Sequence, residues 1–196
     1  NILIKISPIL DITSAINELK FVKEIHVVAI ENEVKELLFL LEKNWNQSIS
    51  IQTINFNKTN NQVFKLDLGE QVSATYSEPK KYIYEPNAAI LKAGAFQQVS
   101  NHLKIAKLHQ HSHLYTSENL IEFPGRSFEI KNCISYDKKQ LKKLIPSKKA
   151  NITTRNFPES VEQIRKKTGL KDGGNQYVFF TTDINNKHIV LICDKI

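Results

Sequence analysis

The chain has 196 residues, of which 41% are hydrophobic, and its 27 Lys and Arg against 20 Asp and Glu give a formal net charge of +7. This length and composition predict one large or two small globular domains and exclude a generally disordered chain. Neither a long apolar run nor a basic leader followed by an apolar stretch is present, so we predict no membrane span and no signal peptide, and expect a cytoplasmic protein.

The first part of the chain alternates strand-like and helix-like patterns. Residues 2–6 form an almost continuous apolar run, which is typical of a parallel strand buried on both faces. Residues 11–19 predict a helix with an aspartate cap, and residues 24–30 predict a second strand. A further helix is predicted over residues 31–43, because apolar residues recur there at helical spacing.

Two more strands are predicted over residues 48–56 and 63–68. Strand, helix and strand in this order indicate a βαβ unit, so we expect part of a doubly wound α/β sheet. The chain opens directly on a strand and contains no methionine. We therefore expect that sequence upstream completes the sheet in the natural protein, the alternative being a processed short protein. An open sheet edge would also favour a dimer.

The middle of the chain is less regular. Residues 69–82 are polar and predict a linker, Pro86 begins a helix that continues to Val99, and residues 107–117 are extended or loop-like. His109, His111 and His113 alternate along this last segment. On a strand they would share one face and could bind a metal ion, although no nearby acid or cysteine completes the set. The alternative is a solvated or RNA-facing loop.

The last third predicts a small α+β layered domain. Strand 128–134, helix 137–144 and strand 150–154 are followed by a helix that Pro158 opens and that Gly169 ends. Residues 177–182 and 188–193 then form a hairpin through Asn185 and Asn186, which gives the order β-α-β-α-β-β. Both cysteines, Cys133 and Cys193, lie in apolar strand-like runs, so we predict two buried thiols in a reducing compartment.

The positive charge is concentrated in this last part. Residues 1–119 carry 12 Lys and 12 acids, whereas residues 120–196 carry 15 Lys and Arg against 8 acids. All three arginines lie in the second group. Such asymmetry predicts an anionic partner for the C-terminal part, the alternative being a basic surface that only confers solubility.

Several residues could form an RNA-binding face. Arg126 follows a Pro-Gly turn, and Arg155 and Asn156 stand before a predicted helix start, where phosphate binds well. Phe157 could stack on a base or instead pack as a hydrophobic staple, and Arg155 could form a surface ion pair instead. The candidate RNA-binding residues are Arg126, Lys142, Arg155, Asn156, Phe157, Lys166 and Lys171.

No sequence motif for an enzyme active site is present. The glycine-rich loops for dinucleotides and triphosphates, the hydrolase nucleophile elbow and paired zinc-binding cysteines are all missing. Ser7 and Pro8 follow the first strand, where open α/β sheets bind their ligands, but a plain turn explains them equally well. A complete enzyme is therefore not predicted from these residues alone.

Segments spread over nearly the whole chain resemble bacterial class I SAM-dependent methyltransferases with a C-terminal THUMP-like domain. In order and spacing the matching segments are residues 5–11, 32–38, 84–87 with 92–94, 113–116, 123–126, 155–158 and 171–174. Ile9, Val34 and Leu91 depart from the family pattern, each by a conservative apolar change. No single segment is decisive, and the resemblance lies in their combination.

The resemblance implies three segments: residues 1–76 from the end of a Rossmann-like methyltransferase sheet, residues 77–120 as a ferredoxin-like connection and residues 121–196 as the THUMP-like domain. It implies RNA that is structured or tRNA-like as partner, and SAM as cofactor of the full-length protein. The family's SAM-binding loop is missing here, so no cofactor is expected in this chain. No catalytic residue carries over, and Ser7 and Pro8 are the nearest candidates.

We therefore expect the C-terminal half of an RNA methyltransferase, which retains an RNA-binding module but is inactive alone. The alternative is a non-catalytic protein-interaction module that uses the same basic face. A stand-alone enzyme on a decayed sheet is a third reading, and it lacks any acid–base or nucleophile constellation.

Overall fold

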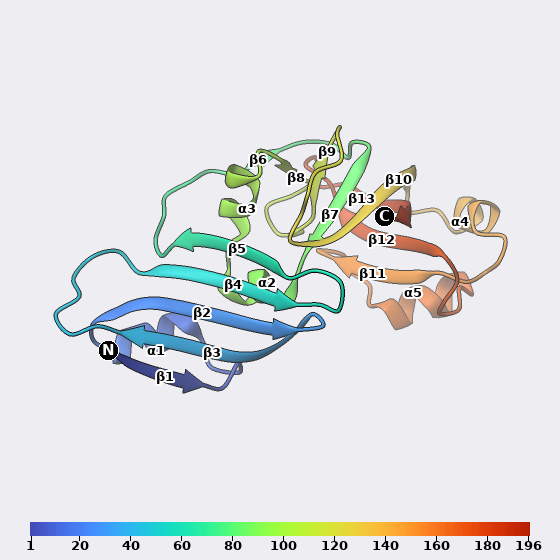
Figure 1. The fold of residues 1–196 in the computed structure, drawn as a ribbon. Helices are drawn as coiled ribbons and strands as arrows, with labels where there is room; N and C mark the ends of the chain where they lie inside the picture. Colours follow the sequence, from blue (N-terminus) through green and yellow to red (C-terminus); the bar gives the residue numbers. More distant parts are fainter. The chain divides into compact units, whose positions relative to one another are not determined.

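The chain passes three times between two structural units (Figure 1). A computed structural model describes residues 1–196. Residues 1–73 and 86–102 form the first unit, and residues 74–85 and 103–196 form the second. The fold is mixed α/β, with one mixed sheet in each unit. The three-segment division implied by the family resemblance stays a prediction.

The first unit is built on a five-stranded sheet with the order β1-β3-β2-β4-β5. Only β2 and β4 are parallel neighbours, and every other adjacent pair is antiparallel, so this sheet is mixed rather than doubly wound and parallel. The strands are β1 (Ile2–Ile6), β2 (Val22–Ile30), β3 (Glu33–Leu41), β4 (Ser50–Phe56) and β5 (Gln62–Asp67).

The predicted helix over residues 31–43 is wrong, because this segment forms the strand β3. Glu31 and Asn32 have φ angles of 48° and 64°, and Ile30 pairs with Glu33 around them. This is a two-residue hairpin turn of the kind that requires positive φ at both positions. β3 lies between β1 and β2, and its fully buried side chains, Leu37 and Phe39, are two positions apart, as strand alternation requires.

Three short helices belong to the first unit. Helix α1 (Ile12–Glu18) has the predicted cap, since the Asp11 side chain accepts the Ser14 amide at 2.9 Å. The single helix predicted from Pro86 to Val99 is divided into α2 (Ala88–Ala93) and α3 (Phe96–His102). Gly94 separates them because it takes the left-handed conformation, φ 68°, that ends α2.

The second unit contains an eight-stranded mixed sheet with the order β11-β12-β13-β10-β7-β9-β8-β6. The predicted order β-α-β-α-β-β is confirmed in its C-terminal part, as is the hairpin between β12 and β13. The elements are β6 (Thr75–Tyr76), β7 (Tyr82–Pro86), β8 (Ala106–Lys107), β9 (Tyr115–Ser117), β10 (Gly125–Ser135), α4 (Lys138–Leu144), β11 (Asn151–Arg155), α5 (Val161–Thr168), β12 (Gln176–Thr182) and β13 (His188–Lys195).

Helix α5 begins later than predicted. Pro158 lies outside it, and Ser160 caps it in a reciprocal arrangement: the Ser160 hydroxyl accepts the Gln163 amide, and the Gln163 side chain accepts the Ser160 amide. Gly169 ends the helix with a φ of 77°, as predicted. None of the helices in the chain is both long and apolar enough to cross a bilayer.

Two separate cores lie on opposite faces of β12 and β13. Helices α4 and α5 cover one face, where the buried side chains include Leu141, Ile164, Val178, Phe180 and Val190. The other face carries Phe179 and Leu191, which pack against residues of β7, β10 and the β8–β9 segment: Ile83, Phe128, Leu108 and Leu114. Residues 121–196 therefore share their second core with earlier parts of the chain.

The two cysteines are both free, but only one is buried. Cys193 lies in the second core, as predicted. The prediction of a buried Cys133 is wrong. A β-bulge between Ile130 and Asn132 shifts the alternation of β10, and Cys133 beyond it is exposed.

Candidate nucleic-acid interface

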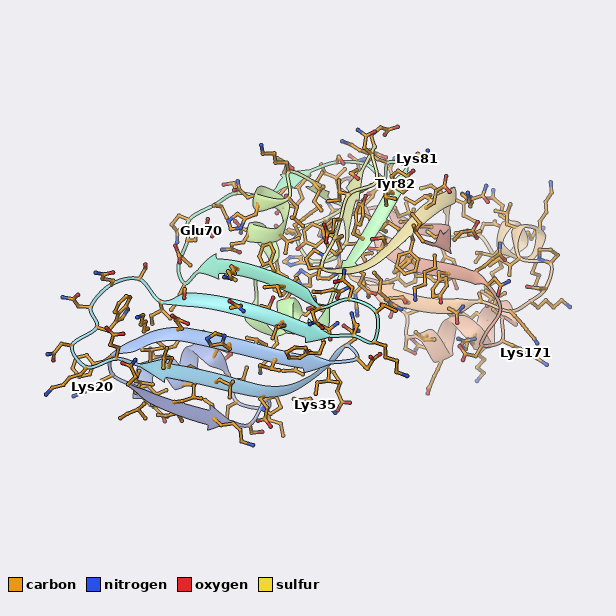
Figure 2. All side chains as sticks on the ribbon, viewed as in Figure 1. Lys20, Lys35, Glu70, Lys81, Tyr82 and Lys171 are labelled. Carbon is orange, nitrogen blue, oxygen red and sulfur yellow. The ribbon has the colours of Figure 1, made fainter.

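The predicted RNA-binding residues fall in two places on the second unit. Lys142 on α4 and Lys166 on α5 are exposed on the helices that cover the first core. Lys171 is also exposed, and Figure 2 shows its side chain at the end of the unit that carries these helices. Arg126 and Arg155 lie elsewhere, and both form an ion pair with the same carboxylate, that of Glu85.

Glu85 is the residue that brings the two arginines together. Its side chain is only 3% exposed, whereas the side chains of Arg126 and Arg155 are 39% and 38% exposed. Arg126 donates from Nε to Glu85 Oε2 at 2.8 Å and also from Nη2 to the same oxygen. Arg155 donates from Nη2 to Glu85 Oε1 at 2.7 Å. Each carboxylate oxygen thus binds one guanidinium.

Strand alternation explains why these residues meet. Glu85 follows Ile83 by two positions on β7, and Arg126 precedes Phe128 by two positions on β10, so both extend rows that line the second core. Arg155 is the last residue of β11 and pairs in register with Thr181 of β12. The charged groups therefore continue the core-facing side of the sheet to its end.

Both arginines keep donors that the carboxylate does not use. The bonds to Glu85 occupy Nε and Nη2 of Arg126 and Nη2 of Arg155, which leaves the N–H groups of both Nη1 atoms and of Arg155 Nε. The Arg126 guanidinium also lies 5.5 Å from the centre of the Phe128 ring. Two partly exposed guanidinium groups held in this way suit a planar or tetrahedral oxyanion.

The three histidines lie on a turn between β8 and β9 rather than on a strand, so they do not share one face as alternation predicted. His109 Nδ1 accepts the His111 amide at 3.1 Å and is 2.9 Å from Asn156 Nδ2, while its Nε2 is 3.1 Å from Asn186 Oδ1. This set fits a neutral ring protonated on Nε2. No group of three or more potential ligand side chains could hold a metal ion.

Lys107 and His113 are two titratable residues at this turn whose pKa values are lowered by burial. Lys107 is buried, its Nζ donates to the Gln110 carbonyl at 2.9 Å, and burial lowers its pKa. Burial, the largest cause, acts together with electrostatic repulsion from Lys107, Arg155 and His111 to lower the pKa of His113 to about 4. His113 is therefore neutral at pH 7, and the surroundings have a positive potential.

Phe157 is placed as a packing residue. Its ring lies 5.5 Å from Tyr136, 5.5 Å from Phe180 and 5.2 Å from His188, all edge to face. It is half-buried against the helix-covered core. Of the two readings of Phe157, these contacts favour the structural one.

Ser7 and Pro8 form the turn after β1. The Ser7 hydroxyl accepts the Ile9 amide at 3.3 Å, and its carbonyl accepts the Leu10 amide at 3.1 Å. A mostly apolar cavity lies between β1 and α1 in this region, and its lining includes Ile4, Ile6 and Leu10. These contacts are those of a plain strand-to-helix turn.

Sequence reasoning missed Glu85, Lys107 and Thr181. Glu85 follows Tyr82, Ile83 and Tyr84, and Lys107 follows Ile105 and Ala106, so each is a lone charge in an otherwise apolar strand-like run. Charged residues are rarely buried without a partner, so a lone charge in such a run indicates a buried ion pair or hydrogen bond. Thr181 carried no comparable signal.

Two adjoining regions of the chain match known protein families. Residues 82–124 match a family described as a ferredoxin-like domain, and residues 125–195 match one described as THUMP domain-like. The crystal structure of a "putative methyltransferase" from Porphyromonas gingivalis W83 matches 98% of this chain with a TM-score of 0.91 and 37% sequence identity. This chain covers 50% of that protein chain. The search of curated proteins found no match to the present chain.

These findings support the coarser part of the family resemblance. The chain carries a THUMP-like domain, and its structure is similar to that of a protein described as a "putative methyltransferase". The THUMP-like match also suggests RNA binding, in agreement with the basic composition of that part of the chain.

Proposed function

We propose that this chain is the RNA-binding part of a SAM-dependent RNA methyltransferase. The observation that carries this proposal is the separation of charge between the two units. The first unit has 8 Lys and no Arg against 9 acids, and the second has 19 Lys and Arg against 11 acids. A net charge of +8 on one unit, beside −1 on the other, suits a polyanionic partner of the second unit.

The exposed lysines of α4 and α5 supply the sequence-independent part of this interaction. Lys142, Lys166 and Lys171 act as point charges toward RNA phosphates. Arg126 and Arg155, with Asn156 beside them, supply directional hydrogen bonds. We assign Phe157 no stacking role in this proposal, because its ring is engaged with Tyr136, Phe180 and His188.

Methyl transfer itself is assigned to the rest of a longer protein. This chain has no glycine-rich loop for SAM, and the P. gingivalis protein that resembles it has twice the matched length. SAM binding, a Rossmann-like sheet and the catalytic residues would then belong to that other part. RNA that is structured or tRNA-like is the proposed substrate, and a bacterial cytoplasm is the proposed location.

The test is the salt dependence of RNA binding by the whole chain. We expect binding of a structured RNA to weaken steeply with salt, with a slope of roughly −0.7 to −0.9 per phosphate contact on logarithmic axes. The change of Lys142 and Lys166 to Gln should reduce the steepness of this slope by about one for each lysine that binds a phosphate. Lys20→Gln on the first unit is the matched control and should leave it unchanged. Salt-insensitive binding would contradict the proposal.

The exposed strand β1 supports a protein-interaction role as a second candidate. β1 is an edge strand of its sheet, and its side chains Ile2 and Leu3 are 63% and 62% exposed. An apolar edge strand is a template for pairing with another chain or domain. Contact with a second copy, or with the remainder of a longer sheet, is compatible with RNA binding by the other unit.

A further inference from the structure

The ion pair at Glu85 has a positive excess. Lys107, Arg126 and Arg155 bring three positive charges, Glu85 brings one negative charge, and His113 is neutral at pH 7. We call these residues, together with Thr181, the Glu85 cluster. Lys107, Arg126, Arg155 and Glu85 thus carry a net charge of about +2. Asp183 and Glu78 are not counted in this sum; they bind the β12–β13 turn, where Asp183 accepts the amides of Asn185 and Lys187, and Glu78 accepts the Asn185 side chain.

A buried hydroxyl without a hydrogen-bond partner lies in this cluster. Thr181 is fully buried, and its Oγ1 has no partner. It pairs in register with Arg155, so the two side chains project from neighbouring strands on the same face. An unpaired buried hydroxyl is destabilising and uncommon, and it is accounted for when a ligand supplies the missing partner.

The cluster is held in place before any ligand arrives. Glu85 fixes both guanidinium groups through three hydrogen bonds. The next residue after Arg155 is Asn156, whose side chain is tied to His109, and His109 is tied in turn to Asn186. Three separate loops are therefore joined around the arginines, which lowers the entropic cost of ligand binding.

We propose that the Glu85 cluster binds the dianionic phosphate of a phosphomonoester, supplied by a phosphorylated end of the RNA. An internal phosphodiester carries one negative charge, whereas a terminal phosphate carries about −1.5 to −2 at pH 7 and three acceptor oxygens. The terminal group suits the positive excess of the cluster, and its three oxygens suit the N–H donors of Arg126 and Arg155 that Glu85 does not use. This inference rests on the proposed function, and it adds a specific anchor to the nonspecific attraction of the lysines on α4 and α5.

The experiment compares one RNA hairpin in three forms: with a 5′-phosphate, with a 3′-phosphate and with hydroxyl groups at both ends. Affinities for the whole chain are measured at two salt concentrations. We expect one phosphorylated form to bind about tenfold more tightly than the hydroxyl form, the scale of one added charge-assisted contact. Inorganic phosphate should raise the melting temperature of the chain and compete with that end effect.

Variants separate a binding role from a structural one. Arg155→Gln should reduce the affinity ratio between phosphorylated and hydroxyl RNA to about one, and Arg155→Lys, which keeps the charge, should restore part of it. Thr181→Val should lower the ratio severalfold while the melting temperature stays equal or rises, because the buried hydroxyl is removed. Lys166→Gln is the control, and it should weaken both RNA forms equally.

Each result decides a different question. Equal, salt-dependent binding of all RNA forms, without an effect of inorganic phosphate, would overturn the phosphomonoester site and leave the proposed function intact. A phosphate effect that Arg155→Gln abolishes, without any end effect on RNA, would support the site and assign it to a small phosphorylated molecule. Absence of salt-dependent binding to any RNA would count against the proposed function itself.

Discussion

Glu85 is a single buried carboxylate on which two cationic side chains depend. Replacement by Gln removes the charge and leaves both guanidinium groups without their counterion. We expect Glu85→Gln to lower the free energy of unfolding by about 1–3 kcal/mol, less than for a fully buried pair because both arginines are partly solvated. Urea denaturation measures this change. Glu122→Gln, at an exposed acid without an ion pair, is the control and should change stability little.

His113 gives the second unit a dependence on pH. Its pKa is about 4 in the folded chain and about 6.5 when unfolded, so the unfolded chain binds the proton more readily between these values. Its contribution to stability is fully present above about pH 6.5 and is lost as the pH falls toward 4. Because the ring is partly exposed, we expect a loss on the order of 1 kcal/mol between pH 7 and pH 5.

The measurement compares urea denaturation of the wild type with that of His113→Asn at both pH values. Asn is the suitable replacement because residue 113 has a φ of 51°, which Asn tolerates. The variant should lose less stability than the wild type on acidification. Identical losses in the two proteins would show that His113 does not titrate in this range.

At the residue scale, sequence reasoning found the arginines but not their organisation. Arg126 and Arg155 stand beside recognisable turns and were predicted as anion-binding groups. Glu85 lies 41 and 70 positions away from them, and the three are brought together only by the sheet order β11-β12-β13-β10-β7. Long-range pairing of this kind is not encoded in local patterns.

At the scale of elements, local signals succeeded where a cap or a turn decides the structure. Asp11, Asp137 and Gly169 mark ends of helices in the sequence and do so in the structure. The segment 33–41 failed because a continuous apolar run satisfies helical and strand periodicity equally well. The two-residue turn before it, with positive φ at both positions, is what distinguishes a hairpin from a helix here. The segment then forms a strand between β1 and β2.

The cap of α5 can be tested directly. The Ser160 hydroxyl accepts the Gln163 amide at 3.3 Å and is half of a capping box at the start of a helix that covers the first core of the second unit. We expect Ser160→Ala to lower the free energy of unfolding by about 1 kcal/mol. Urea denaturation provides the value, with Thr59→Ala in an exposed turn as control. If Ser160→Ala and Thr59→Ala lowered the free energy of unfolding equally, the capping box would not stabilise α5.

At the scale of the whole molecule, the open edge of the first sheet predicts self-association. The exposed apolar side chains of β1, including Ile2 and Leu3, lie on an edge strand. We expect analytical ultracentrifugation to show a concentration-dependent dimer, which Leu3→Glu weakens by placing a charge on the edge. Lys20→Glu, at an exposed residue of the same unit outside β1, is the control for added negative charge. A monomer at all concentrations would contradict the prediction.

The repeated crossing of the chain between the two units has a consequence for synthesis on the ribosome. The first unit is complete once residue 102 has emerged, but by then residues 74–85, which belong to the second unit, are already outside the tunnel. Their partners in β10 and the second core are synthesised later. Until then, Ile83, Tyr84 and Glu85 are exposed, because the contacts that bury them have not formed. At about 5–20 residues per second, this exposure lasts for seconds. Nascent chains of this protein should therefore engage chaperones over this short segment.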